Sequence, residues 1–152
     1  FPFSEMGVKI NNNMPLENFN LLKKYIHNIK NKKILVLGAA YRSEVDDTRN
    51  SPSETFILKC LRMGAKIDVH DPYAKKFDKL DIKIVNKMPK ISNYNAVVLA
   101  VNHKFYSNFD FVKWMGKSGT VFLDTTNLFK QRIYEKLIKN GNKVIIPGRG
   151  DL

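Results

Sequence analysis

Apolar runs of strand length alternate with segments of helical periodicity along most of the chain. Residues 34–37 and 96–101 are apolar at every position, which is typical of parallel strands covered on both faces. Further strands are predicted at 66–70, 82–85, 120–124 and 143–146, and helices at 15–29, 52–63, 74–80, 105–114 and 131–139. This alternation implies right-handed crossovers and a parallel sheet. We therefore predict an α/β fold, a Rossmann-like three-layer domain with a mainly parallel sheet, preceded by an N-terminal linker helix.

The polar stretch at 30–32 separates the N-terminal helix from the first strand and divides the chain into two predicted segments. Residues 1–30 hold a loop-like opening followed by the amphipathic helix. Residues 31–152 hold all the predicted strands, and their length suits one domain with a full core.

The connection after the first predicted strand is unusually long. The strand ends at Gly38, and a helix-start signal follows only at Ser51 and Pro52, where Ser51 can cap and Pro52 suits the first turn. The loop therefore has about a dozen residues, whereas strand-to-helix loops usually take about 2–6. Open parallel sheets bind ligands beyond the carboxyl ends of their strands, so this loop is the predicted ligand site.

The start of this loop departs from the dinucleotide-binding pattern G-x-G-x-x-G. Ala40 and Ser43 stand where the second and third glycines belong, and a methyl group at the second position obstructs a pyrophosphate. The standard NAD position is therefore predicted to be lost. The Tyr41 ring and the Arg42 guanidinium could instead serve a nucleotide's base and phosphates by stacking and charge-assisted hydrogen bonds. The alternative is that both side chains only fill and brace the loop.

Charged residues continue along the same loop. Asp46 and Asp47 do not suggest a metal site, because adjacent carboxylates rarely converge without further ligands nearby. An ion-paired brace with Arg42 and Arg49 is the favoured interpretation. Arg49 also lies just ahead of the Ser51 helix start, whose exposed N–H groups favour anions, so it is a candidate phosphate ligand.

Three further polar positions follow predicted strands. Asp71 could contact a ribose, but with Pro72 behind it an N-cap for the helix at 74–80 is favoured. His103 has no evident partner that would make it a base, so a structural role is favoured. The segment from Asp124 to Asn127 could bind a ligand or cap the next helix.

The single cysteine, Cys60, shares the apolar face of its predicted helix with Phe56 and Ile57. It is therefore predicted to be a buried, inert thiol, which agrees with a reducing compartment. The sequence has no apolar run of membrane-spanning length and no charged signal-peptide head, so we expect a cytoplasmic protein without membrane contact. The absence of a starting Met suggests a piece of a longer protein.

The formal net charge of +12 admits nucleic acid as a partner. However, lysines are scattered over every segment and only five of the 26 basic residues are arginine. Specific nucleic-acid readers rely on arginine for bidentate contacts. Nucleic-acid binding is therefore disfavoured.

Several motifs in a fixed order resemble the C-terminal domain of the UDP-glucose/GDP-mannose dehydrogenase family. They are Gly38-Ala39-Ala40-Tyr41-Arg42, Asp46-Asp47-Thr48-Arg49, Ser51-Pro52, Gly64-Ala65 and Asp71-Pro72-Tyr73. Asn11 with Met14-Pro15 and the following helix resembles the family's link from its central dimerisation domain. By this resemblance, residues 1–30 are the end of the linker and its helix, and residues 31–152 are the UDP-binding domain.

The resemblance implies a role in a larger enzyme. Family members use NAD in two steps to oxidise the C6 alcohol of a nucleotide sugar, of the UDP-glucose or UDP-N-acetylhexosamine type, to a carboxylate. Tyr41 and Arg42 would contact the nucleotide of the UDP-sugar, and Arg49 would reach toward NAD held mainly by another domain. The full-length protein would be a homodimer. The alternative is a stand-alone nucleotide-binding or basic nucleic-acid-binding module without catalysis.

The resemblance assigns no catalytic residue to this chain. The glycine-rich segment that carries the family's cysteine nucleophile is absent from it, and Cys60 lies on a different element. Arg42 stands where the family usually has Lys, and Ser43 stands where proline commonly follows. Many members also place a basic ligand shortly after the aspartate that Asp124 matches, where this chain has Thr125, Thr126 and Asn127.

Overall fold

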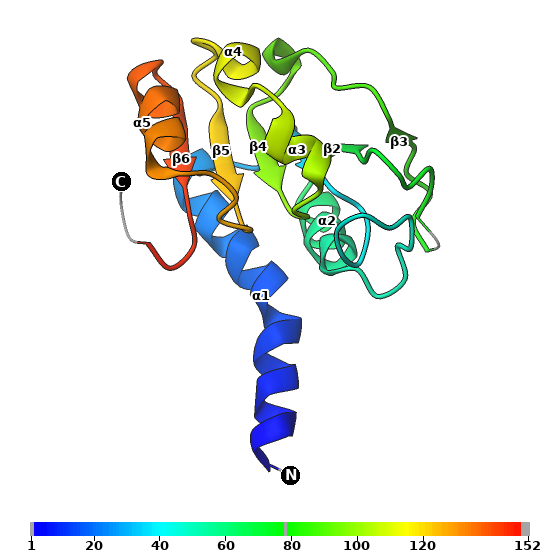
Figure 1. The fold of residues 1–152 in the computed structure, drawn as a ribbon. Coiled ribbons are helices and arrows are strands. Elements are labelled where there is room, and N and C mark those ends of the chain that lie inside the picture. The colour runs from blue at the N-terminus through cyan, green and yellow to red at the C-terminus, as the bar shows by residue number, and fades with distance from the viewer. Residues whose placement is uncertain (1, 78, 150–152) are drawn as a thin grey trace.

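A computed structural model describes residues 2–77 and 79–149 of the chain. Its helices are α1 (Pro2–Ile26), α2 (Pro52–Arg62), α3 (Lys104–Asn108), α4 (Phe111–Met115) and α5 (Gln131–Lys139), with a 3-10 turn at Ile91–Asn93. Its strands are β1 (Lys33–Leu37), β2 (Lys66–His70), β3 (Ile84–Val85), β4 (Ala96–Leu99), β5 (Val121–Asp124) and β6 (Lys143–Ile145). Helices and strands alternate along much of the chain (Figure 1), although β3 follows β2 without a helix between them and α3 is followed directly by α4.

The six strands form one parallel sheet in the order β3-β2-β1-β4-β5-β6. This is the order of a doubly wound Rossmann fold, in which the direction of winding reverses between the first and fourth strands. Ile34 of β1 pairs with Ile67 on one side and with Ala96 on the other. The predicted fold class is confirmed, and the reversal point lies at the loop that follows β1.

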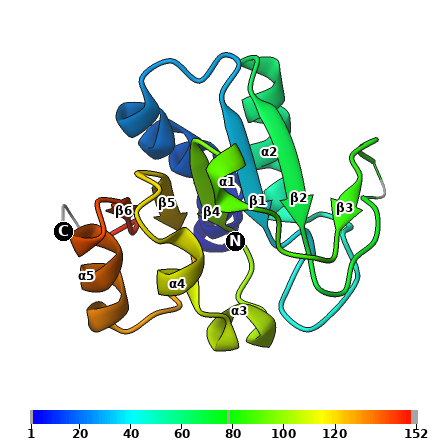
Figure 2. The ribbon, with the colours of Figure 1, turned by 90° about the horizontal axis from the view of Figure 1, so that it is seen from above.

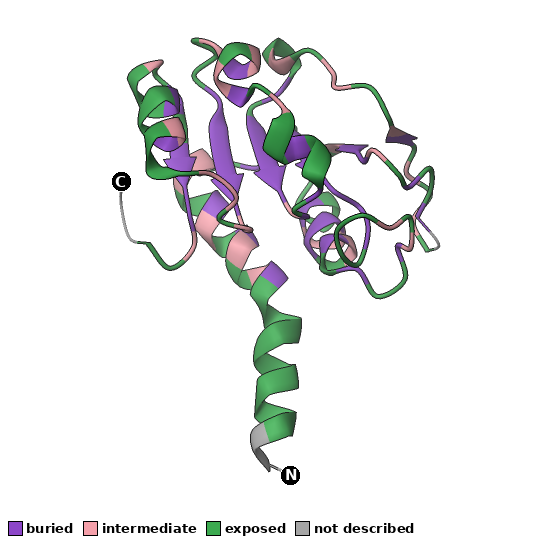
Figure 3. Ribbon diagram, in the orientation of Figure 1, coloured by how far each residue is buried: buried purple, intermediate pink, exposed green. Residues whose placement is uncertain are grey.

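Alternate strand residues bury the two faces of the sheet separately. Ile34 and Val36 face α1 and α2, whereas Leu35 and Leu37 face the side of α3, α4 and α5. Figure 2 shows the two groups of helices on opposite sides of the strands, and Figure 3 shows the buried strands between them. The result is the predicted three-layer arrangement.

The N-terminal helix is longer than the pattern predicted. Residues 2–14, expected to be loop-like, are helical, and Pro15 lies inside α1. The second half of α1 packs on α2 and β5 through Phe19 and Leu22. The first half projects beyond the carboxyl ends of the strands and is exposed along its described length (Figures 1 and 3). The sequence of that half lacks the apolar periodicity of an amphipathic helix, because no core packs against it.

Two other predicted helices differ in the structure. The helix predicted at 105–114 is broken into α3 and α4 at Phe109 and Asp110, and Asp110 caps α4 by accepting from the Lys113 N–H. The helix predicted at 74–80 is wrong for its described residues, where Lys76 instead forms an antiparallel bridge with Lys83. Residue 78 of that prediction, and residues 150–152 of the second predicted domain, lie outside the described residues.

Cys60, on the inner face of α2, is fully buried as predicted, and burial raises the pKa of its thiol to about 12. Since the thiolate is the reactive form, we expect an aromatic disulfide reagent to leave the folded protein unmodified at neutral pH. The same reagent should modify one thiol per chain in denaturant, as measured by release of the coloured thiol. Rapid modification without denaturant would contradict this burial.

Candidate functional site

The loop between β1 and α2 lies along the carboxyl edge of the sheet. It leaves β1 through Gly38, whose φ is +101° and where a β-carbon would collide with Val101. Ala39 and Ala40 are buried, and the chain then turns outward, so that Tyr41 is 59% exposed and Arg42 is exposed as well. The loop returns at Ser51, which accepts from the Ser53 N–H and donates to the Ala40 carbonyl. The predicted Ser51 cap is confirmed.

Asp71, at the end of β2, holds the beginning of this loop. Its Oδ2 accepts from the Ala39 N–H at 2.7 Å and from the Ala40 N–H at 3.3 Å. Its Oδ1 accepts from the N–H groups of Tyr73 and Ala74. The carboxyl group is fully buried, and although burial opposes its ionisation, these bonds and one from His103 lower its pKa to about 2. Asp71 is therefore a buried anion that organises two loops.

The Asp71 carboxylate therefore already binds the first two N–H groups of the turn after β1, those of Ala39 and Ala40. Asp71 also has no exposed surface with which to contact a ribose. The favoured prediction of an N-cap was half right, because the cap-like bonds exist but no helix follows them.

His103 has partners that the sequence did not reveal. Its Nε2 lies 3.1 Å from Oδ2 of Asp71, and its Nδ1 accepts from the Glu44 N–H at 3.0 Å. Because Nδ1 is an acceptor, the proton of the neutral ring belongs on Nε2, where it is donated to Asp71. The histidine is fully buried. It joins the base of the loop to its tip, which agrees with the favoured structural role, although the sequence did not reveal Asp71 as its carboxylate partner.

The charged brace predicted in the loop is confirmed for Asp47 and Arg49. The Arg49 Nε donates to Oδ1 of Asp47 at 2.9 Å and its Nη2 donates to Oδ2 at 2.7 Å. These hydrogen bonds lower the pKa of Asp47 to about 2. The Arg49 side chain remains 70% exposed. A bidentate pair of this kind fixes the plane of the guanidinium.

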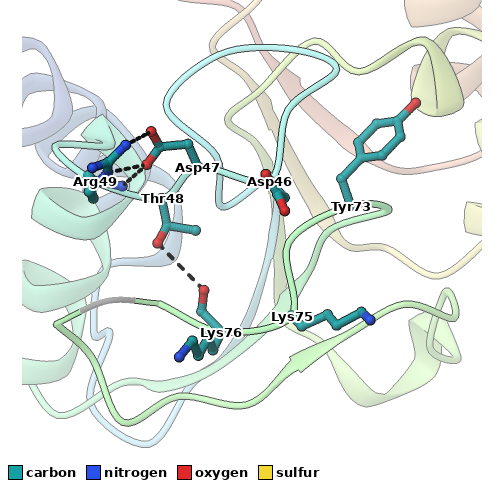
Figure 4. Close-up of a pocket in the computed structure, with 7 residues that line it drawn as sticks. All are labelled: Asp46, Asp47, Thr48, Arg49, Tyr73, Lys75 and Lys76. Atoms are coloured by element: carbon teal, nitrogen blue, oxygen red, sulfur yellow. Dashed lines mark hydrogen bonds and ion pairs between the residues drawn. The ribbon is translucent and has the colours of Figure 1, made fainter.

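Asp47 and Arg49 line an open hollow of about 590 Å³ beside the loop. Its other lining residues are Asp46, Thr48, Tyr73, Lys75 and Lys76. Figure 4 shows Arg49 and Lys75 well apart among these residues, with the hydrogen bond from the Thr48 hydroxyl to the Lys76 carbonyl between them. Within residues 2–77 and 79–149, no group of three or more His, Cys, Asp or Glu side chains is arranged so that it could hold a metal ion.

Tyr41 lines a different hollow, of about 360 Å³, between the projecting part of α1 and the start of α2. Asn11, Asn50 and Glu54 are among its other lining residues. The structure therefore places Tyr41 and Arg49 beside separate hollows at one edge of the sheet, and Arg42 lines neither of the two.

Asp124 is a brace rather than an exposed ligand. It is fully buried, and it accepts from the N–H and hydroxyl of Thr126, the N–H of Leu128 and the hydroxyl of Tyr134. Asp124 does not cap the next helix, α5, whose N-cap residue is Lys130, so its bonds brace the turn that follows β5.

The sequence pattern of the UDP-glucose/GDP-mannose dehydrogenase family, UDP binding domain, matches residues 35–131. The chain belongs to this family. The match runs from β1 to the first residue of α5 and includes the whole loop described above. It supports the C-terminal domain of a UDP-sugar dehydrogenase over the stand-alone module.

Relatives agree with this family membership. A UDP-N-acetyl-D-mannosamine dehydrogenase of Methanocaldococcus jannaschii is 30% identical over 93% of the chain, which covers 33% of that protein. The UDP-N-acetyl-D-mannosamine dehydrogenase of Pyrococcus horikoshii is 33% identical over 86% of the chain, which covers 31% of that protein. The solved structure of the NDP-N-acetyl-D-galactosaminuronic acid dehydrogenase from Methanosarcina mazei matches with a TM-score of 0.82 at 29% identity. The match covers 93% of this chain and 30% of that one. The chain thus spans about a third of these family members.

Proposed function

We propose that this chain is the part of an NAD-dependent nucleotide-sugar 6-dehydrogenase that binds the nucleotide of a UDP-sugar. The observation that carries the proposal is the loop after β1. Its inward N–H groups are occupied by Asp71, while the Tyr41 ring and the Arg42 guanidinium are presented outward at the edge where such sheets bind ligands. An aromatic ring beside a cation suits a base and its phosphates.

In this proposal the chain carries no catalytic residue, and the oxidation of the sugar C6 alcohol takes place on other parts of the enzyme. Arg49 would contact NAD held mainly by another domain, since Asp47 orients its guanidinium toward an open hollow. The whole enzyme would be a cytoplasmic homodimer. In the described part of the chain, no helix is long and apolar enough to span a bilayer.

We expect the chain to bind UDP in calorimetric titration, and Arg42→Ala to weaken that binding at least tenfold. A charge-assisted hydrogen bond contributes about 1.5–3 kcal/mol, which corresponds to a factor of ten or more. Raising the salt concentration should weaken binding by the wild-type chain more than by the variant.

Arg62→Ala is the matched control, because Arg62 is an exposed arginine in the last turn of α2, at the opposite edge of the sheet. It should leave UDP binding unchanged. Absence of UDP binding by the wild-type chain, or equal losses in the two variants, would refute the proposed role of the loop.

A further inference from the structure

Glu44, two residues beyond Arg42, ties the outer part of the loop to the rest of the domain. One carboxylate oxygen accepts from the Tyr73 hydroxyl at 2.8 Å, and the other accepts from the Lys104 N–H at 2.6 Å. Its own backbone N–H is donated to Nδ1 of His103. We refer to Glu44 with Tyr73, His103 and the Lys104 N–H as the Glu44 clasp.

The clasp joins three separate segments at the carboxyl edge. Tyr73 follows β2, and His103 and Lys104 stand at the start of α3, so the loop tip is held from both sides of the β1 carboxyl end. His103 continues inward to Asp71, which binds the loop's first N–H groups. A continuous chain of hydrogen bonds therefore runs from the buried base of the loop to its exposed tip.

The backbone at Glu44 indicates that these contacts hold the loop against its local preference. Glu44 has a φ of +63°, in the left-handed region that side chains other than those of Gly, Asn and Asp rarely occupy. Its carboxyl pKa is lowered by the Lys104 N–H and the Tyr73 hydroxyl, so the group is charged at neutral pH. The conformation at this position is thus maintained by three hydrogen bonds rather than by the residue type.

We propose that the Glu44 clasp positions Tyr41 and Arg42 for nucleotide binding, with Glu44 and His103 as positioning residues that do not touch the ligand. This inference rests on the proposed function of the loop. Binding to a loop that adopts the competent shape only part of the time is weakened by that fraction. The clasp would therefore act on affinity by keeping the loop in one shape before the nucleotide arrives.

The test uses Glu44→Ala, because Glu44 is exposed and its removal leaves the core intact. Amide hydrogen exchange at residues 41–47 should become several-fold faster without ligand, and UDP should bind about tenfold more weakly, as expected if the loop is competent for about a tenth of the time. Glu135→Ala, an exposed glutamate of α5, is the matched control and should change neither quantity.

Tyr73→Phe supplies a second, independent variant that removes only the hydroxyl. It should weaken UDP binding severalfold in the wild-type background and have no further effect in Glu44→Ala, since the two groups form one hydrogen bond. Glu44→Gln keeps an oxygen that can accept from the Lys104 N–H and should restore part of the affinity. A general loss of stability would give neither the coupling nor this rescue.

The outcomes separate the two proposals. Unchanged exchange in Glu44→Ala, or faster exchange with unchanged UDP affinity, overturns the clasp while leaving the function of Arg42 intact. Failure of the wild-type chain to bind UDP overturns the proposed function and, with it, the positioning role. Faster exchange together with weaker UDP binding in Glu44→Ala, and with normal affinity in Glu135→Ala, supports both.

Discussion

Asp71→Asn is expected to lower the free energy of unfolding by about 3 kcal/mol, because hydrogen bonds to a charged group contribute about 1.5–3 kcal/mol each and an amide replaces only some of them. The carboxylate accepts from four N–H groups and from His103, with both oxygens in use. An amide must turn its NH₂ group toward some of these donors. Urea unfolding followed by circular dichroism measures the loss, and Asp81→Asn, an exposed aspartate, is the control that should change little.

The same carboxylate makes a defined contribution to acid unfolding. Its pKa is about 2 in the folded protein against an ordinary value of 3.8. A lowered folded-state pKa means that the stabilisation is fully present above about pH 4 and is lost as the pH falls toward 2. The difference between wild type and Asp71→Asn should therefore shrink by about 2 kcal/mol over this window. A constant difference would contradict the lowered pKa.

Gly38→Ala is the second substitution for which a large effect is expected. A β-carbon at this position would lie 2.4 Å from Cβ of Val101 and 2.8 Å from its backbone nitrogen. The φ of +101° is also strained for alanine. Overpacking of about 1–3 kcal/mol adds to a conformational cost of about 1–2 kcal/mol, so a total near 3 kcal/mol is expected.

Gly141→Ala separates the two contributions to this cost. Gly141 also has a positive φ, +87°, but a β-carbon there meets no atom within 4 Å. Only the conformational cost of about 1–2 kcal/mol should appear in its urea unfolding curve. Equal destabilisation by the two substitutions would mean that the chain moves away from Val101 at little cost.

The strands could be predicted because each carries its own signal. The apolar run at β4 and the β-branched run at β1 can be recognised as strands from their own residues alone. Helix α5 was predicted with the bounds Gln131–Lys139 that the structure has, because an apolar stripe and the following Asn140 and Gly141 mark its end.

The network around the loop could not be predicted in the same way. Asp71, His103 and Glu44 are far apart in the sequence, and each has an ordinary local explanation as a cap, a core histidine or a surface acid. The wrong prediction of a helix at 74–80 has a related cause. Asp71 accepts hydrogen bonds from N–H groups of a turn, and Lys76 then forms a bridge with Lys83. Tertiary contacts overrode a weak local preference there. Tyr41, Arg42 and Arg49 were singled out from their loop, but their ligands stay predictions.

The strand order also constrains how the chain can fold. β1 can pair with β2 early, but its other neighbour is β4. Ile34 can therefore meet Ala96 only after residues 35–95 have been synthesised. Long-range parallel pairing of this kind slows folding, because loop-closure entropy is lost before the contacts form. During synthesis from the N-terminus, one edge of β1 and the loop that follows it therefore remain uncovered until residues of β4 and α3 leave the ribosome.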